Sequence, residues 1–195
     1  MIPYKVISRI AELKNQWIAL IGERVLDEYG QSIDYWRVER ADSVIVIPFI
    51  GEKIIIPKLY YRHGIGDVTY DFPGGRIDGE NTPIATAFMV LERELGVQRD
   101  AIVSIEPLNQ KGWFVDSSFS TQKVYAFEAI LSDNAPLIQK MVACKELIGK
   151  DEISNIFEKL HCLQCRHALL EWLLIKNYPD SALMNRFCPG VGNKD

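Results

Sequence analysis

The feature that most constrains the fold is a glycine-rich loop that leads into a sharply bounded helix, within residues 72–97. Pro73-Gly74-Gly75 predicts a loop, because glycine reaches backbone conformations that are closed to other residues. Thr82 is typical of a helix N-cap and Pro83 of the first helical position. Gly96 is typical of a left-handed C-terminal cap. The segment therefore predicts one helix that begins at the proline and ends before the last glycine.

The predicted helix has an apolar stripe at three- and four-residue spacing, which suits docking on a sheet. The stripe consists of Ile84, Ala87, Phe88, Leu91 and Leu95. Two runs rich in Ile, Val and Tyr, Ser43–Ile50 and Ile54–Tyr61, are separated by Gly51-Glu52-Lys53 and predict a β-hairpin. Further strands are predicted at 17–21, 33–38, 68–72, 101–105, 113–115 and 123–130, a short helix before Trp17, and amphipathic helices near 153–160 and 168–175.

This order of strands, helix, strands and helices predicts an α/β domain with a mixed sheet flanked by helices. The chain has 195 residues, 48% of them hydrophobic, which suits one packed core. Residues 1–42 read as an N-terminal β extension of the same unit, because their short strands could not bury a core alone. Residues 43–195 form the main domain in this interpretation.

Charge and hydropathy exclude two classes of partner. A formal net charge of -4 provides no basic field for a nucleic-acid backbone. The longest apolar run, Val44–Ile50, is too short to cross a bilayer, and the start of the chain lacks the layout of a signal peptide. A cytoplasmic protein without nucleic-acid or membrane partners is expected.

The segment from Phe72 to Val97 resembles the Nudix box, whose pattern is G-x5-E-x7-R-E-U-x-E-E-x-G-U with U a bulky aliphatic residue. The matching positions are Gly75, Leu91, Glu94, Gly96 and Val97. Lys58-Leu59-Tyr60-Tyr61-Arg62 followed by Asp71-Phe72-Pro73-Gly74-Gly75 is similar to the branch of ADP-ribose and nucleoside-diphosphate-sugar pyrophosphatases, which has Q-Y-R and P-G-G at similar separation. The resemblance implies a Nudix-type α/β/α sandwich with a mixed sheet and a small N-terminal β extension that forms a homodimer.

The departures from the pattern fall on its chemistry. Met89-Val90 stands where the family has an Arg-Glu pair, Arg93 replaces the first residue of the Glu-Glu pair, and Asn81 occupies the loop position, preceded by Glu80. Family members use these carboxylates to hold Mg²⁺ or Mn²⁺ against a diphosphate, because hard cations need oxygen ligands. Only Glu94 remains in register, and Arg93 adds a positive charge beside it.

The resemblance assigns roles to six residues. Glu94 would hold the metal and act with Glu80 in catalysis, while Arg62, Gly74, Gly75 and Arg76 would bind the substrate phosphates, since a guanidinium fork suits phosphate oxygens. The alternative for both arginines is an ordinary surface position. The later loop, about residues 134–144, lacks the acidic residue that the branch places there. Glu128, Glu146 or a partner subunit could replace the missing carboxylates.

Two functions stay open from the sequence. The first is a weakened Mg²⁺- or Mn²⁺-dependent hydrolase of a nucleoside diphosphate linked to another moiety, such as ADP-ribose or a nucleotide sugar. The second is a catalytically inactive nucleotide-binding or structural module with the same fold. Trp17, Tyr35 and Trp36 could stack on an adenine, but aromatic residues in short strands more often lie in a core or a dimer interface.

The cysteines, at positions 144, 162, 165 and 188, are expected to be free thiols, because nothing indicates export. The run His161-Cys162-Leu163-Gln164-Cys165-Arg166-His167 suggests zinc. Four ligands within seven residues cannot readily surround one tetrahedral ion, since structural sites usually draw on two separated segments. A redox C-x-x-C site is less favoured still, because no strand leads directly into it.

Overall fold

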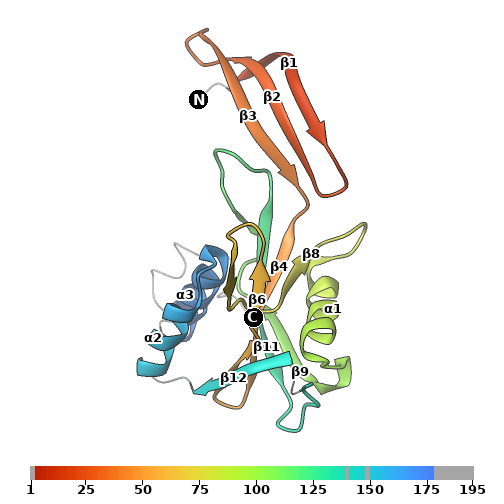
Figure 1. Cartoon of the computed structure of the whole chain (residues 1–195), viewed down its shortest axis with the longest axis vertical. Coiled ribbons are helices and arrows are strands. Elements are labelled where there is room, and N and C mark those ends of the chain that lie inside the picture. Colours follow the sequence, from red (N-terminus) through yellow and green to blue (C-terminus); the bar gives the residue numbers. More distant parts are fainter. Residues whose placement is uncertain (1–2, 139–140, 148–149, 178–195) are drawn as a thin grey trace, which may run out of the picture. The chain divides into compact units, whose positions relative to one another are not determined.

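The computed structural model describes residues 3–138, 141–147 and 150–177. The chain forms two compact units (Figure 1). The first consists of Met1–Asp42 and Trp113–Lys123, and the second of Ser43–Gly112 and Val124–Asp195.

The first unit is built on a three-stranded antiparallel sheet. Its strands are β1 (Lys5–Lys14), β2 (Ile18–Leu26) and β3 (Ser32–Arg40), in the order β1-β2-β3. The short strand β10 (Trp113–Phe114) also belongs to this unit. The predicted strands at 17–21 and 33–38 are confirmed as parts of β2 and β3.

The predicted helix before Trp17 is wrong, since this segment is strand β1. Val6, Ile10 and Leu13 have the three- to four-residue spacing of an amphipathic helix, which explains the error. The strand accommodates this spacing with register shifts between Val6 and Ser8 and between Arg9 and Ala11. Such bulges insert a residue and change which side chains share a face.

The two tryptophans considered for the first unit, Trp17 and Trp36, do not lie in a buried core. Trp17 is 62% exposed and Trp36 is 44% exposed. Trp36 lies over Gly22, where an added Cβ would be 2.9 Å from the indole ring. The core alternative is therefore wrong for both tryptophans, and the dimer interface stays a prediction.

The second unit contains a mixed sheet, as expected. Its central order is β11-β4-β5-β12; β4 pairs parallel with β11 and antiparallel with β5, and β5 pairs antiparallel with β12. Two further strands join it, β8 on β4 and β9 on β11. The bounds are β4 (Ser43–Ile50), β5 (Lys53–Pro57), β8 (Gly74–Arg76), β9 (Ile102–Pro107), β11 (Lys123–Leu131) and β12 (Val142–Leu147), with a separate pair β6 (Tyr60–Arg62) and β7 (Asp67–Thr69).

Helices cover both faces of this sheet (Figure 1), which confirms the α/β/α sandwich. On one face α1 (Pro83–Leu95) buries Ala87, Val90, Leu91 and Leu95 against β4 and β11 in a single hydrophobic cluster. Ile84 and Phe88 of the predicted stripe lie outside this cluster, and Ile84 is exposed. On the other face lie α2 (Lys150–Lys159) and α3 (Leu163–Asn177), where Trp172 stacks on Phe49 at 4.7 Å between ring centroids. Val44 and Val46 contribute to the α1 side, so Phe49 points the other way because side chains alternate along a strand.

Three details differ from the expectation. The predicted strand at 68–72 is limited to β7 and pairs with β6 instead of the main sheet. The predicted loop at Pro73-Gly74-Gly75 contains the start of β8, because Gly74 lets the backbone approach β4 to a point where a Cβ would be 3.1 Å from the Val44 carbonyl. Strand β12 has no clear signal in its mixed apolar and charged sequence, VACKEL.

None of the described helices is both long enough and apolar enough to span a membrane.

Candidate functional site

The caps of α1 fix where the last turn of this helix lies, as the sequence predicted. Thr82 Oγ1 accepts a hydrogen bond from the Ala85 N–H at 3.2 Å, and Pro83 begins the helix. At the other end Gly96 has φ 73°, and its N–H donates to the Glu92 carbonyl at 2.9 Å. The helix therefore ends at a defined place, with its last turn beside β8.

The glycines of β8 allow the strand to lie directly against α1. A Cβ at Gly75 would be 2.9 Å from Val90 Cγ2 and 3.1 Å from Arg93 Nη2. Val90 is fully buried, so this apolar residue fills the helix face below the glycine. A larger side chain at Gly75 would have to displace either the helix or the Arg93 guanidinium.

Arg93 and Glu94 form the polar part of this contact. Arg93 Nη2 donates to the Gly74 carbonyl at 2.8 Å and to Glu94 Oε1 at 2.7 Å. The Glu94 side chain is 17% exposed, whereas that of Arg93 is 61% exposed. The Glu94 carboxylate is thus mostly buried, whereas the Arg93 guanidinium has further N–H donors that face solvent.

The electrostatics link this pair to β6. Burial raises the pKa of Glu94, opposed by Arg93, by the Gly74 backbone and by Arg62. Burial also raises the pKa of Tyr60, and the Glu94 charge adds to that increase. The Arg62 guanidinium lies 5.5 Å from the Tyr60 ring centroid. These four side chains therefore belong to one site beside the glycine loop.

Arg62 also binds Asp71, which directly precedes the loop. Its Nε donates to Asp71 Oδ2 at 2.8 Å, and Nη2 lies 2.5 Å from the same oxygen. This ion pair holds Arg62 in place while half of its side chain remains exposed. Asp71 and Tyr60 are members of the site that the motif did not indicate, because their role depends on the short β6-β7 pair.

The remaining predicted residues lie around the loop but do not complete a metal site. Arg76 Nε is 2.6 Å from Asp78 Oδ1, and Glu80 is exposed in the following turn. Within the described ranges, Glu94 belongs to no group of three acidic, histidine or cysteine side chains close enough to share one ion. A single carboxylate that is already bound by arginine does not fit Mg²⁺, which needs several oxygen ligands.

Glu128 cannot replace the missing carboxylates. Its Oε1 accepts from Trp172 Nε1 at 2.9 Å and lies 3.0 Å from Lys176 Nζ, both on α3. Glu128 therefore points to the face of the sheet opposite α1. The side chain of Glu146, the other candidate, lies outside the described residues. Cys162 and Cys165 are free thiols as expected, while the Cys144 side chain and Cys188 lie outside the described residues.

In the second unit a mixed sheet lies between α1 and the α2/α3 pair, with a glycine loop against the last turn of α1. A solved structure of an ADP compounds hydrolase superimposes with a TM-score of 0.67, covering 91% of this chain and 97% of that chain at 13% sequence identity. At this identity the likeness concerns the fold. No family model matches the sequence.

Proposed function

We propose that the second unit binds a nucleoside diphosphate linked to another moiety, of the ADP-ribose or nucleotide-sugar class, and that arginines neutralise its phosphates in place of a divalent cation. The observation that carries this proposal is the position of Arg93, which is bonded to both Gly74 and Glu94 at the loop. We interpret the segment from Phe72 to Val97 as a degenerate Nudix box. An arginine then stands where the family has a carboxylate.

The exposure of the arginines supports phosphate binding. The side chains of Arg93, Arg62 and Arg76 are 61%, 50% and 35% exposed, so each can reach a ligand at the loop. Arg93 is bonded to the Gly74 carbonyl and the Glu94 carboxylate, and Arg62 to the Asp71 carboxylate. A guanidinium has five N–H donors, so these partners orient both arginines and leave further donors for phosphate oxygens. Preoriented donors lose less conformational entropy when a ligand binds.

The same arrangement argues against efficient metal-dependent hydrolysis. A Mg²⁺ ion brought to Glu94 would have to compete with the Arg93 guanidinium for the only carboxylate in register. An Mg²⁺ ion bound to Glu94 would lie beside the positively charged Arg93 guanidinium, and two positive charges in contact repel strongly in a partly buried site. We therefore expect pyrophosphatase activity to be lost or very weak in this chain.

The second candidate function is Mg²⁺- or Mn²⁺-dependent hydrolysis of the same class of ligand. It is favoured by Glu94, which keeps the register of the motif at the end of α1. In this alternative Glu94 holds the metal and Glu80 joins from the exposed turn. Binding would then depend on the metal, and a nucleoside monophosphate would be released.

One titration series distinguishes the two functions. The thermal stability of the full chain is measured with ADP-ribose and ADP-glucose, in Mg²⁺ and in EDTA, and the same samples are assayed for AMP. Our proposal expects an equal rise in Tm with and without metal and no AMP, because a ligand that prefers the folded state stabilises it. AMP release that requires Mg²⁺ would establish the second function, and no stabilisation by any such ligand would refute both.

A homodimer formed through the first unit is part of the proposal. Its sheet exposes large apolar side chains on the surface, among them Val6, Ile7, Ile10 and Leu13 of β1 and Trp36 of β3. In the described part of the chain β1 pairs with β2 alone, so its other edge is available to a second strand. Light scattering should give the mass of a dimer, and Leu13→Glu should lower it; a wild-type monomer at every concentration would contradict the proposal.

A further inference from the structure

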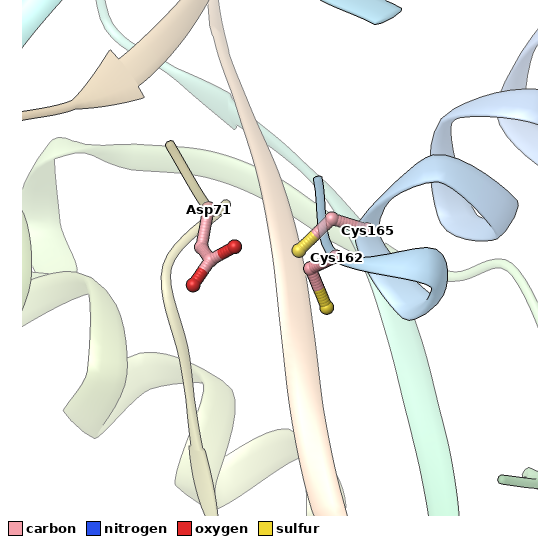
Figure 2. A group of neighbouring side chains, drawn as sticks. All are labelled: Asp71, Cys162 and Cys165. Carbon is pink, nitrogen blue, oxygen red and sulfur yellow. The ribbon is translucent and has the colours of Figure 1, made fainter. Parts of the chain in front are cut away.

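Two cysteines and an aspartate from distant segments come together on the α3 side of the site. Cys162 directly precedes α3 and Cys165 lies in its first turn, where the Arg166 N–H donates to the Cys162 carbonyl at 3.0 Å. Asp71 lies in the segment that leads into the glycine loop. One ligand atom from each of the three residues lies within 4.8 Å of the other two (Figure 2).

The burial of this group indicates that it needs a partner. Asp71 is 8% exposed and Cys165 is 2% exposed, whereas Cys162 is half-buried. Asp71 Oδ2 is bound by Arg62, but its buried Oδ1 has no hydrogen-bond partner in the described part of the chain. Figure 2 shows the carboxylate facing the two sulfur atoms. A buried carboxylate oxygen without a partner is costly, so a cation or donor at this point would stabilise the fold.

The types of ligand indicate which cation fits. Thiolates are soft ligands that select zinc over Mg²⁺ or Ca²⁺, and zinc also accepts a carboxylate oxygen. The spacing C-x2-C places two sulfurs on one turn, and Asp71 supplies a ligand from a second, separated segment. Three protein ligands with a water in the fourth position is one of the arrangements in which proteins hold zinc. His161 and His167 are not members of the group, so the ligand set differs from the one that the sequence suggested.

We propose that Cys162, Cys165 and Asp71 bind one zinc ion, with water in the fourth position. The metal ties the start of α3 to the segment before the glycine loop. Arg62 acts as the outer partner of the Asp71 ligand, because its hydrogen bonds to Oδ2 orient Oδ1 toward the metal. The zinc site adjoins the phosphate site that we propose, because Arg62 is bonded to Asp71. The zinc proposal does not rest on nucleotide binding.

A redox dithiol is the competing explanation. The hydrogen bond with Cys165 lowers the pKa of Cys162 to about 6, against the opposing effects of burial and Asp71, and a lowered pKa is also typical of reactive C-x-x-C thiols. The position of Asp71 separates the two explanations. A buried carboxylate oxygen without a partner beside the two sulfurs is expected for a metal site and is unexplained for a disulfide.

The test uses the full chain, purified without metal-affinity steps and dialysed against trace zinc. We expect about one zinc per chain by elemental analysis, and replacement by Co²⁺ should give thiolate-to-cobalt charge-transfer absorption and the visible bands of a tetrahedral site. Zinc content that is absent after reconstitution, together with a spectrum of octahedral Co²⁺, would overturn the proposal.

Variants separate the proposed ligands from their neighbours. Cys162→Ser and Asp71→Asn should each weaken zinc binding about tenfold or more, while His161→Ala and His167→Ala should leave it unchanged. Loss of zinc only in the histidine variants would overturn this ligand set. Mass spectrometry of the wild-type protein under non-reducing conditions gives a measurement that does not depend on the folding of the variants. A Cys162–Cys165 disulfide in the purified protein would support the redox alternative and contradict the zinc site.

Discussion

The guanidinium of Arg93 lies 2.7 Å from the carboxylate of its own neighbour, Glu94, and also holds the Gly74 carbonyl. Consecutive helical residues normally point in different directions, so this contact depends on the close approach of β8 to the last turn of α1. The contact makes Glu94 half of an ion pair, while the Arg93 side chain remains 61% exposed. In the proposed interpretation of this segment as a degenerate Nudix box, exposed positive charge then stands where the pattern has negative charge.

Replacing Arg93 should reduce nucleotide affinity without any need for metal. We expect Arg93→Glu to weaken ADP-ribose binding at least about tenfold in EDTA, which corresponds to about 1.4 kcal/mol. The reason is the loss of a phosphate donor and the addition of a negative charge beside Glu94. Calorimetry measures the change, and Arg24→Ala in the first unit, which removes an exposed arginine paired with Asp34, serves as the control. Unchanged affinity in Arg93→Glu would show that this arginine does not contact the ligand.

The raised pKa of Glu94 predicts a pH-dependent effect of its removal. Because burial raises the pKa of the folded state above its ordinary value of 4.5, the folded protein holds this proton more tightly than the unfolded chain does. The free energy of unfolding therefore falls as the pH rises from the ordinary pKa of the carboxyl group to its raised pKa in the folded protein. Glu94→Gln should be more stable than wild type at about pH 7, with the difference closing at about pH 4. Denaturation with urea in EDTA measures this, and a variant that is less stable at neutral pH would show that the Arg93 contact outweighs burial.

Gly96 should tolerate no side chain. Its φ of 73° costs any L-residue about 1 kcal/mol or more, and an added Cβ would lie 2.4 Å from Ile138 Cγ1. We expect Gly96→Ala to lower the free energy of unfolding by at least about 2 kcal/mol. Gly66→Ala is the matched control, since Gly66 has φ 68° but nothing within 4 Å of an added Cβ, and it should lose about half as much. Equal losses in both variants would exclude the clash with Ile138.

Glu128 should matter for stability and not for nucleotide binding. Glu128→Ala removes the acceptor of the Trp172 indole N–H and the partner of Lys176, so we expect a loss of about 1–3 kcal/mol. Glu128→Gln retains an acceptor for Trp172 and should lose less. Affinity for ADP-ribose should be unchanged in both, because the residue lies on the opposite face of the sheet from α1. A Glu128 variant that folds normally but binds no nucleotide would place this residue in the site after all.

Local signals made much of the second unit predictable. Thr82, Pro83 and Gly96 mark the ends of α1 by backbone preferences that act within a few residues. The hairpin around Gly51 follows from the alternation of apolar runs and a short turn, and β4 and β5 form there. That Val90 and Arg93 stand in place of carboxylates rests on the resemblance to the Nudix box and stays a prediction.

The rest depends on contacts between distant segments. The apolar residues of β1 fit a helical period, and pairing with β2 decides in favour of a strand. Asp71 gives no sign in the sequence that it faces Cys162 and Cys165, because that contact arises only when α3 packs on the sheet. Similarly, no local pattern shows that Glu128 turns toward Trp172. Side chains alternate along β11, but this alternation shows which face of the sheet Glu128 occupies only when the neighbouring strand and helix are known.

The parallel pairing of β4 with β11 has a consequence for how the chain acquires its structure. Val44 lies beside Tyr125 in this register, so the ribosome must synthesise residues 72–97 and β9 before β11 can pair with β4. Until then the apolar sequence SVIVIPFI has an unprotected edge. Closing so long a loop is entropically costly and slow, and the growing polypeptide is most exposed to aggregation during that interval.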